Sequence, residues 1–139
     1  MGMSTVSGPW RSLAGFMEPV VYVKATDVVA GEVNIPAGAN VVILSPADGG
    51  PATECTLVLP EVVSGAFDLN NQPADVRYNG IQGRATNYGA VAHKLKGFGA
   101  QTISGVAEVT IAAGTVVQWG GNGNQAAPWI AISTAILAA

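Results

Sequence analysis

The side chains that could do chemistry are few in this sequence. The chain of 139 residues contains one histidine, His93, and one cysteine, Cys55. Nucleophilic catalysis would need His93 as the general base, but the Gly-x-Ser-x-Gly motif of a nucleophile elbow is missing. One Cys and one His also fall short of a structural zinc site unless carboxylates join them. We therefore interpret Cys55 as a small buried hydrophobe and His93 as a satisfied surface or interface residue.

Two loop segments match ligand-binding motifs only in part. Asp68, Asn70 and Asn71 offer oxygen atoms suited to calcium, but the acid count and terminal Glu of a strong calcium loop are missing. The glycine-rich segment 120–125 is not followed by Lys-Ser or Lys-Thr, as a phosphate-binding loop would be. Any two of the nine acidic residues could meet as a glycosidase pair, and the sequence does not show which. We predict a protein that is not an enzyme and that binds no metal and no cofactor.

Basic residues are concentrated in one segment. Residues 76–107 contain no acidic residue and four cations: Arg77, Arg84, Lys94 and Lys96. Two interpretations remain open, a solvated face of one hairpin and a basic surface that docks on an acidic protein partner. The net charge of -3 and the scarcity of aromatic residues argue against a nucleic-acid partner.

The aromatic residues suggest a second kind of site. Trp119 and Trp129 flank the glycine-rich segment, where they would form either a carbohydrate platform or a cap on the core. Tyr78 and Tyr88 are further candidates for contact with a glycan.

The elements that must position these residues are predicted from two related stretches. Glu108–Trp119 places two alternating runs around a small-residue turn, and Glu32–Ile43 repeats the pattern 76 positions earlier. Five of their first seven positions are identical. Pro36 and Gly38 suit a tight reversal in the first turn and Gly114 suits one in the second, while the β-branched runs suit strands. Both stretches are therefore predicted to be hairpins. Asn79-Gly80 predicts a further hairpin turn.

The complete pattern predicts an all-β protein. About eight to ten short strands at regular spacing indicate an antiparallel β-sandwich or jelly roll, residues 19–139, preceded by an extended N-terminal arm, residues 1–18. The final strand, Trp129–Leu137, is apolar on both faces and should be central or covered by a neighbour. The arm would either fold over its own sheet or pack on a neighbouring subunit, through the residues Trp10, Leu13, Phe16 and Met17.

Composition places the chain outside several classes. Apolar residues make up 49% and charged residues 11%, with 18 Gly and 8 Pro, a mixture that favours short strands and tight loops over a helical bundle. The N-terminus lacks the basic start and following apolar run of a signal peptide. No apolar run is long enough for a membrane helix. We expect a soluble protein with no membrane partner, made in the cytoplasm.

The motifs Ile35-Pro36-Ala37-Gly38 and Ile111-Ala112-Ala113-Gly114, followed by Thr115–Trp119 and a C-terminal apolar strand, resemble small jelly-roll decoration (cement) proteins of tailed-phage capsids. The resemblance implies a virion structural protein that binds the major capsid protein on the outer shell as a homotrimer and stabilises it after synthesis in the host cytoplasm. It carries over no catalytic residue. The candidate residues for subunit and capsid contacts are the four apolar arm residues, the four cations, and Trp129, Ile132 and Ile136.

Two other functions remain open. A receptor-binding head of a phage tail or head fibre would recognise a host surface glycan through Trp119, Trp129, Tyr78 and Tyr88. A cupin-like barrel that binds a small ligand or metal is the third, although cupin metals need several His and this chain has one.

Overall fold

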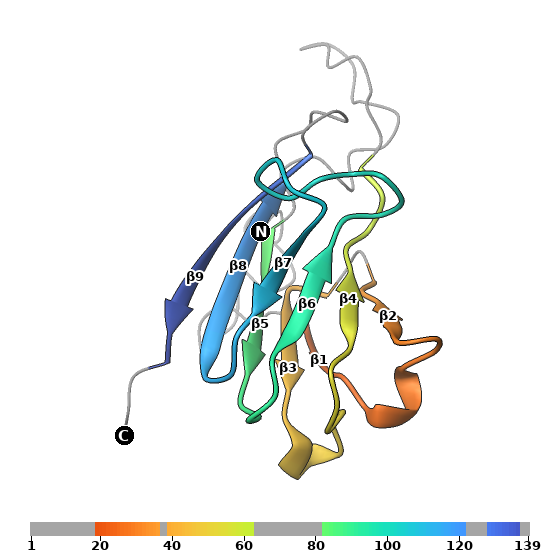
Figure 1. Ribbon diagram of the computed structural model, residues 1–139, viewed down its shortest axis with the longest axis vertical. Helices are drawn as coiled ribbons and strands as arrows, with labels where there is room; N and C mark the ends of the chain where they lie inside the picture. The colour runs from red at the N-terminus through yellow and green to blue at the C-terminus, as the bar shows by residue number, and fades with distance from the viewer. Residues whose placement is uncertain (1–18, 37–38, 63–81, 122–127, 137–139) are drawn as a thin grey trace, which may run out of the picture.

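The computed structural model describes residues 19–36, 39–62, 82–121 and 128–136, which form a sandwich of two β-sheets (Figure 1). The five-stranded sheet has the order β1-β3-β5-β8-β9, with bounds Val20–Tyr22, Val41–Leu44, Gln82–Asn87, Thr115–Gly121 and Trp129–Ala135. The four-stranded sheet has the order β2-β4-β6-β7, with bounds Glu32–Asn34, Thr56–Val58, His93–Lys96 and Glu108–Ile111. Among these residues the only helical segments are two short 3₁₀ turns, η3 (Ala25–Asp27) and η4 (Pro46–Asp48). The expected all-β sandwich is confirmed.

The sheets are mixed, which corrects the expectation of an antiparallel jelly roll. Successive strands from β1 to β6 alternate between the two sheets. The strands that become neighbours are parallel: β1, β3 and β5 in one sheet, and β2, β4 and β6 in the other. Only the last three strands pair antiparallel, β7 with β6, β8 with β5, and β9 with β8. A strand in the opposite sheet thus serves as the crossover that parallel pairing requires.

The two predicted hairpins are also corrected, because neither consists of paired strands. β2 and β3 lie in different sheets, as do β7 and β8, so each turn carries the chain across the sandwich as an arch. Gly114 takes a left-handed φ of 69° in the second arch. The Thr115 hydroxyl donates to the Ala112 carbonyl oxygen there at 2.7 Å.

The similarity between these stretches nevertheless has a structural meaning. Ile35 and Ile111 are both buried in the core, and Val33 and Val109 pack against it. Glu32 and Glu108 both lie on the outer face, where each forms an ion pair with a lysine of β6. The shared Glu-Val-x-Ile pattern therefore encodes the same inward and outward alternation twice.

The core lies between the sheets and is formed by inward side chains of both. Leu57, Leu95 and Ile111 of the four-stranded sheet face Val42, Ala85, Val117, Trp119 and Trp129 of the five-stranded sheet. Each of these residues is at most 4% exposed. Alternate residues of the same strands consequently point outward and create two outer faces.

Several predictions fall outside the described residues. These are the arm, residues 1–18, the Asn79-Gly80 hairpin, the Asp68–Asn71 loop and most of the glycine-rich segment.

Candidate interaction surface

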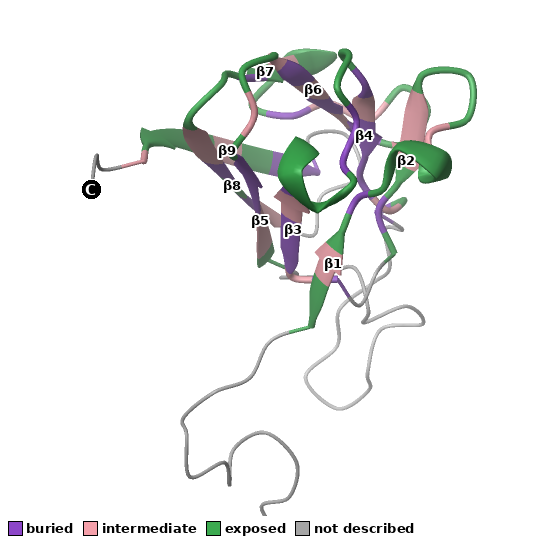
Figure 2. Cartoon of the chain, turned by 90° about the horizontal axis from the view of Figure 1, so that it is seen from below, coloured by how far each residue is buried: buried purple, intermediate pink, exposed green. Residues whose placement is uncertain are grey.

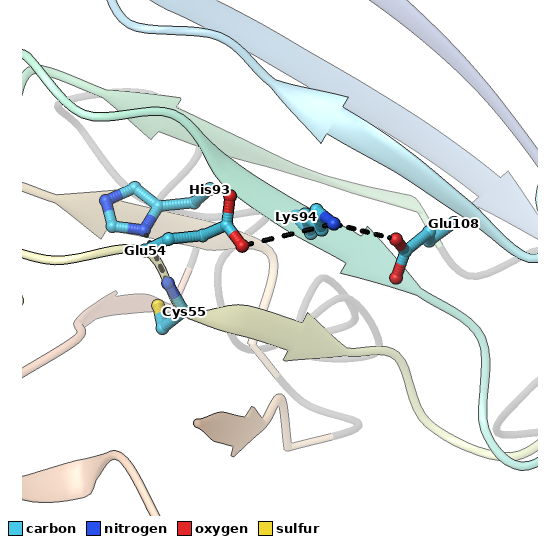
Figure 3. Close-up of polar contacts among 5 residues, drawn as sticks. All are labelled: Glu54, Cys55, His93, Lys94 and Glu108. Atoms are coloured by element: carbon cyan, nitrogen blue, oxygen red, sulfur yellow. Dashed lines mark hydrogen bonds and ion pairs between the residues drawn. The ribbon is translucent and has the colours of Figure 1, made fainter. Parts of the chain in front are cut away.

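The outer face of the four-stranded sheet is polar and internally paired. Lys94 Nζ lies 3.0 Å from Glu108 Oε1 and 3.9 Å from Glu54 Oε1 (Figure 3). The hydrogen bond to Glu108, together with the charges of Glu108 and Glu54, raises the pKa of Lys94. Lys96 Nζ lies 2.6 Å from Glu32 Oε2. The lysines of β6 are therefore paired with glutamates on this face, and such exposed ion pairs are compatible with contact with water.

The outer face of the five-stranded sheet is different, because it exposes apolar side chains near both edges. On β9, Ile130 and Ile132 are 60% and 64% exposed. On β1, Val20 and Tyr22 are 52% and 49% exposed. Apolar side chains are therefore exposed at both edges of this face.

A groove of about 220 Å³ lies at the β9 end of this face. Ile130 and Ile132 form one wall, and Gln118 and Gln82 come from the neighbouring strands. Gln118 is directly opposite Ile132, and Gly120 is directly opposite Ile130. The absence of a side chain at Gly120 leaves Ile130 without a cross-strand neighbour on this face, which helps to open the groove.

β9 is the edge of its sheet, which corrects the expectation that this strand could be central. At the start of the strand, backbone groups of Trp129 and Ala131 on the side away from β8 form hydrogen bonds with Ser104. The Trp129 carbonyl accepts from Ser104 N at 2.8 Å, and Ala131 N donates to Ser104 Oγ at 3.0 Å. Beyond Ala131 no described residue pairs with this edge of β9, and its exposed end extends past the rest of the sandwich (Figure 2).

The only Cys and the only His of the chain lie side by side, but in an arrangement unsuited to nucleophilic catalysis. Cys55 N donates a hydrogen bond to His93 Nδ1 at 3.1 Å (Figure 3). Burial lowers the pKa of His93 despite the opposing charge of Glu54, and burial followed by the same charge raises the pKa of the Cys55 thiol. Both residues are at most 2% exposed, so His93 is a core residue rather than the expected surface residue.

The two tryptophans near the glycine-rich segment are also buried. Trp119 is 4% exposed and Trp129 is 1% exposed, so the core interpretation is correct and neither provides a carbohydrate platform. The indole N–H of Trp129 has no hydrogen-bond partner among the described residues. Burial also removes Trp129 from the candidates for a surface contact.

The remaining candidates are divided between the two faces. Ile132 lies on the outer face of the five-stranded sheet, and half-buried Ile136 follows β9, where its N–H donates to the Gly114 carbonyl at 2.9 Å. Arg84 belongs to β5, in the sheet opposite Lys94 and Lys96. The described cations thus do not form one basic surface. Five predicted residues lie outside the described part: Trp10, Leu13, Phe16, Met17 and Arg77.

Sequence reasoning missed Ile130, Val20 and Tyr22 on the apolar face. Ile130 could have been found, because it is two positions from Ile132 and therefore shares its face of a strand. Val20 and Tyr22 have the same spacing, but the sequence does not show that their strand joins the sheet that contains β9.

Comparisons of the chain with protein-family models, curated proteins and solved structures returned no match. Within the described ranges, no three His, Cys, Asp or Glu residues are grouped as metal ligands would be. The same ranges contain no helix with the length and apolar character needed to cross a bilayer.

Proposed function

We propose that this protein is a virion structural protein that decorates a phage capsid as a homotrimer and stabilises the shell. The β9 end of the outer face of the five-stranded sheet, together with the edge of β9 beyond Ala131, makes the subunit and shell contacts. The biological setting comes from the resemblance of the two arch motifs and the C-terminal strand to capsid decoration proteins.

The observation that carries the proposal is the edge of β9 beyond Ala131, with which no residue in the described part of the chain pairs. Soluble proteins usually shield a sheet edge with charges, Pro or a very short strand. β1, at the other edge of the sheet, is three residues long, and Pro19 precedes it. β9 is seven residues long and contains neither a charge nor Pro. Such an edge favours pairing with another chain.

The energetics favour an assembly with several contacts over a single one. Full burial of an Ile side chain contributes about 1.5–3 kcal/mol. Ile130 and Ile132 are 60% and 64% exposed, so burying what remains of both supplies roughly 2–4 kcal/mol. Association costs at least about 4 kcal/mol in lost freedom of motion, so these two residues do not suffice alone. A trimer that also binds the shell repeats the contact and gains from multivalency.

The association is tested first in solution. The purified chain is expected to have the mass of a trimer by light scattering, and Ile132→Lys to have the mass of a monomer. Thr110→Lys places the same charge on an exposed strand residue of the opposite outer face and should remain trimeric. A monomeric wild-type chain would contradict the proposed assembly.

The role in the virion is tested on particles. Capsids that lack the protein should break at a lower temperature or under milder osmotic shock, and added wild-type protein should restore them. Unchanged particle stability together with no capsid binding would exclude a cement role.

The competing function, recognition of a host glycan by a fibre head, loses two of its four candidate residues. Trp119 and Trp129 are buried, Tyr78 lies outside the described residues, and Tyr88 is 61% exposed. The tryptophan platform therefore gives no support to that function.

A further inference from the structure

A cleft of about 750 Å³ lies at the other end of the apolar face, away from the β9 groove. Tyr22 of β1 and Tyr88, which follows β5, both line it and are 49% and 61% exposed. Ile43 and Ser45 also line it, and among the described lining residues Asp48 of η4 is the only charged one. Its volume lies within the range of small-ligand sites.

The first loop that borders the cleft is held in place by backbone hydrogen bonds. Asp48 N and Gly50 N both donate to the Ser45 carbonyl, at 3.0 and 2.9 Å. Lys24 Nζ donates to the Asp48 carbonyl oxygen at 2.6 Å and lies 5.6 Å from the centroid of the Tyr22 ring. Lys24 therefore links the Tyr22 wall to η4.

The second loop is held by a buried side chain. Asn87 Oδ1 accepts from Gly89 N at 3.0 Å, and Asn87 Nδ2 donates to the Val91 carbonyl at 2.8 Å. The two loops also meet, since a Cβ added to Gly89 would lie 3.1 Å from the Pro46 ring. A ligand would thus meet preformed walls, which lowers the entropic cost of binding.

The lining chemistry favours a neutral, hydroxyl-rich ring. A sugar has an apolar face of C–H groups, which stacks on an aromatic ring, and an edge of hydroxyls, which donate to a carboxylate. Tyr22 and Tyr88 offer the rings, and Asp48 and Ser45 offer the hydrogen-bonding groups. The carboxylate of Asp48 repels an anionic ligand, and Lys24 is already engaged beside it.

We propose that this cleft, bordered by Tyr22 and Tyr88, is a binding site for a neutral saccharide. It goes beyond the proposed capsid role, because a decoration protein with such a site would also attach its particle to glycans on a surface.

The test uses an array of oligosaccharides built from neutral hexoses and N-acetylhexosamines, with sialylated and sulfated glycans on the same slide. Wild-type protein should bind members of the neutral set. Tyr22→Ala and Tyr88→Ala should each weaken that binding about tenfold, because each removes one stacking surface. Asp48→Asn should weaken binding to the neutral set while leaving the fold intact.

The matched control is Phe98→Ala, which removes a different exposed aromatic side chain outside the cleft and should bind as wild type does. Circular dichroism on every variant separates loss of the site from loss of the fold. No binding to any neutral glycan, or equal binding by wild type and both folded Tyr variants, would overturn the proposal. If the Tyr variants instead lose only trimer formation or capsid binding, the cleft is a protein contact and the saccharide site is excluded.

Discussion

Gly83 and Trp119 lie directly opposite each other on β5 and β8, and the indole ring occupies the space that a side chain at Gly83 would need. A Cβ built on Gly83 would lie 2.6 Å from Cζ2 and 2.7 Å from Cε2 of Trp119. Such distances are well inside van der Waals contact, and Trp119 is itself buried between the sheets. The glycine is therefore required by the packing of the tryptophan.

Gly83→Ala is expected to destabilise the protein because the added methyl group must displace Trp119 from a packed core. Overpacking of this kind costs about 2 kcal/mol, which corresponds to a melting temperature roughly 5–10 °C lower. The measurement is thermal unfolding followed by circular dichroism. Gly120→Ala is the control on the neighbouring strand, since the nearest atom to its added Cβ is 4.0 Å away. Equal melting temperatures for the two variants would contradict the packing argument.

Asn87→Ala is expected to lower the free energy of unfolding by about 2–3 kcal/mol, because it leaves three backbone groups without their partner. The Asn87 side chain joins β5 to the carbonyl of Ile111 in the other sheet at 3.1 Å, in addition to its bonds to Val91 and Gly89. Urea denaturation measures the difference. Asn40→Ala removes a single exposed bond to the Gln82 carbonyl and should cost less than about 1 kcal/mol. A loss of similar size in both variants would argue against a linking role for Asn87.

His93 should make the protein less stable in mild acid. Burial lowers its pKa below the ordinary value of 6.5, so between these two values the unfolded chain binds a proton that the folded chain does not. Stability is therefore fully present above pH 6.5 and decreases as the pH falls toward the folded pKa. Urea unfolding of the wild type between pH 8 and 5.5 should show this decrease.

The matched variant for this titration is His93→Gln, which keeps a hydrogen-bond acceptor available to Cys55 N but does not titrate. Its stability should vary less over the same pH range. If both proteins lose stability in parallel, other groups cause the acid sensitivity.

The lysines of β6 should matter little for stability and not at all for association. Lys94→Ala and Lys96→Ala each break exposed ion pairs and should lower the melting temperature by no more than roughly 2 °C. The small loss should disappear at high salt, because exposed charges are screened. Light scattering should still give the wild-type mass, and dissociation of either variant would point to the charged face as the subunit contact.

The strands could be predicted from the sequence more completely than their connections. Alternation and β-branched residues place Val41–Leu44 and Thr115–Trp119 in strands, and both are strands in the structure. The turns show only that the chain reverses. A hairpin and an arch use the same Pro and Gly chemistry, and the difference lies in which sheet the next strand joins. That choice depends on distant residues such as Trp119 and Trp129, which fill the space between the sheets.

The candidate surface was predicted less well, for the same reason. Ile132 was found because it lies in a recognisably apolar strand, whereas the division of the cations between two faces depends on the order of the strands. The burial of His93 could have been predicted from a local pattern. His93 is two positions from Leu95 in the same strand, so the two side chains share one face, and Leu95 is fully buried in the core.

The change of sheet after every strand means that β1 to β6 wind as successive turns of a flat coil (Figure 1). A coil of this kind has no natural end, since each turn presents parallel edges on which another turn can stack. β7 and β8 reverse direction and lie against β6 and β5, so they cap the last turn in both sheets. The cap closes the last turn in both sheets, and it leaves β9 as the longest edge strand of the described domain, the edge through which we propose that copies join.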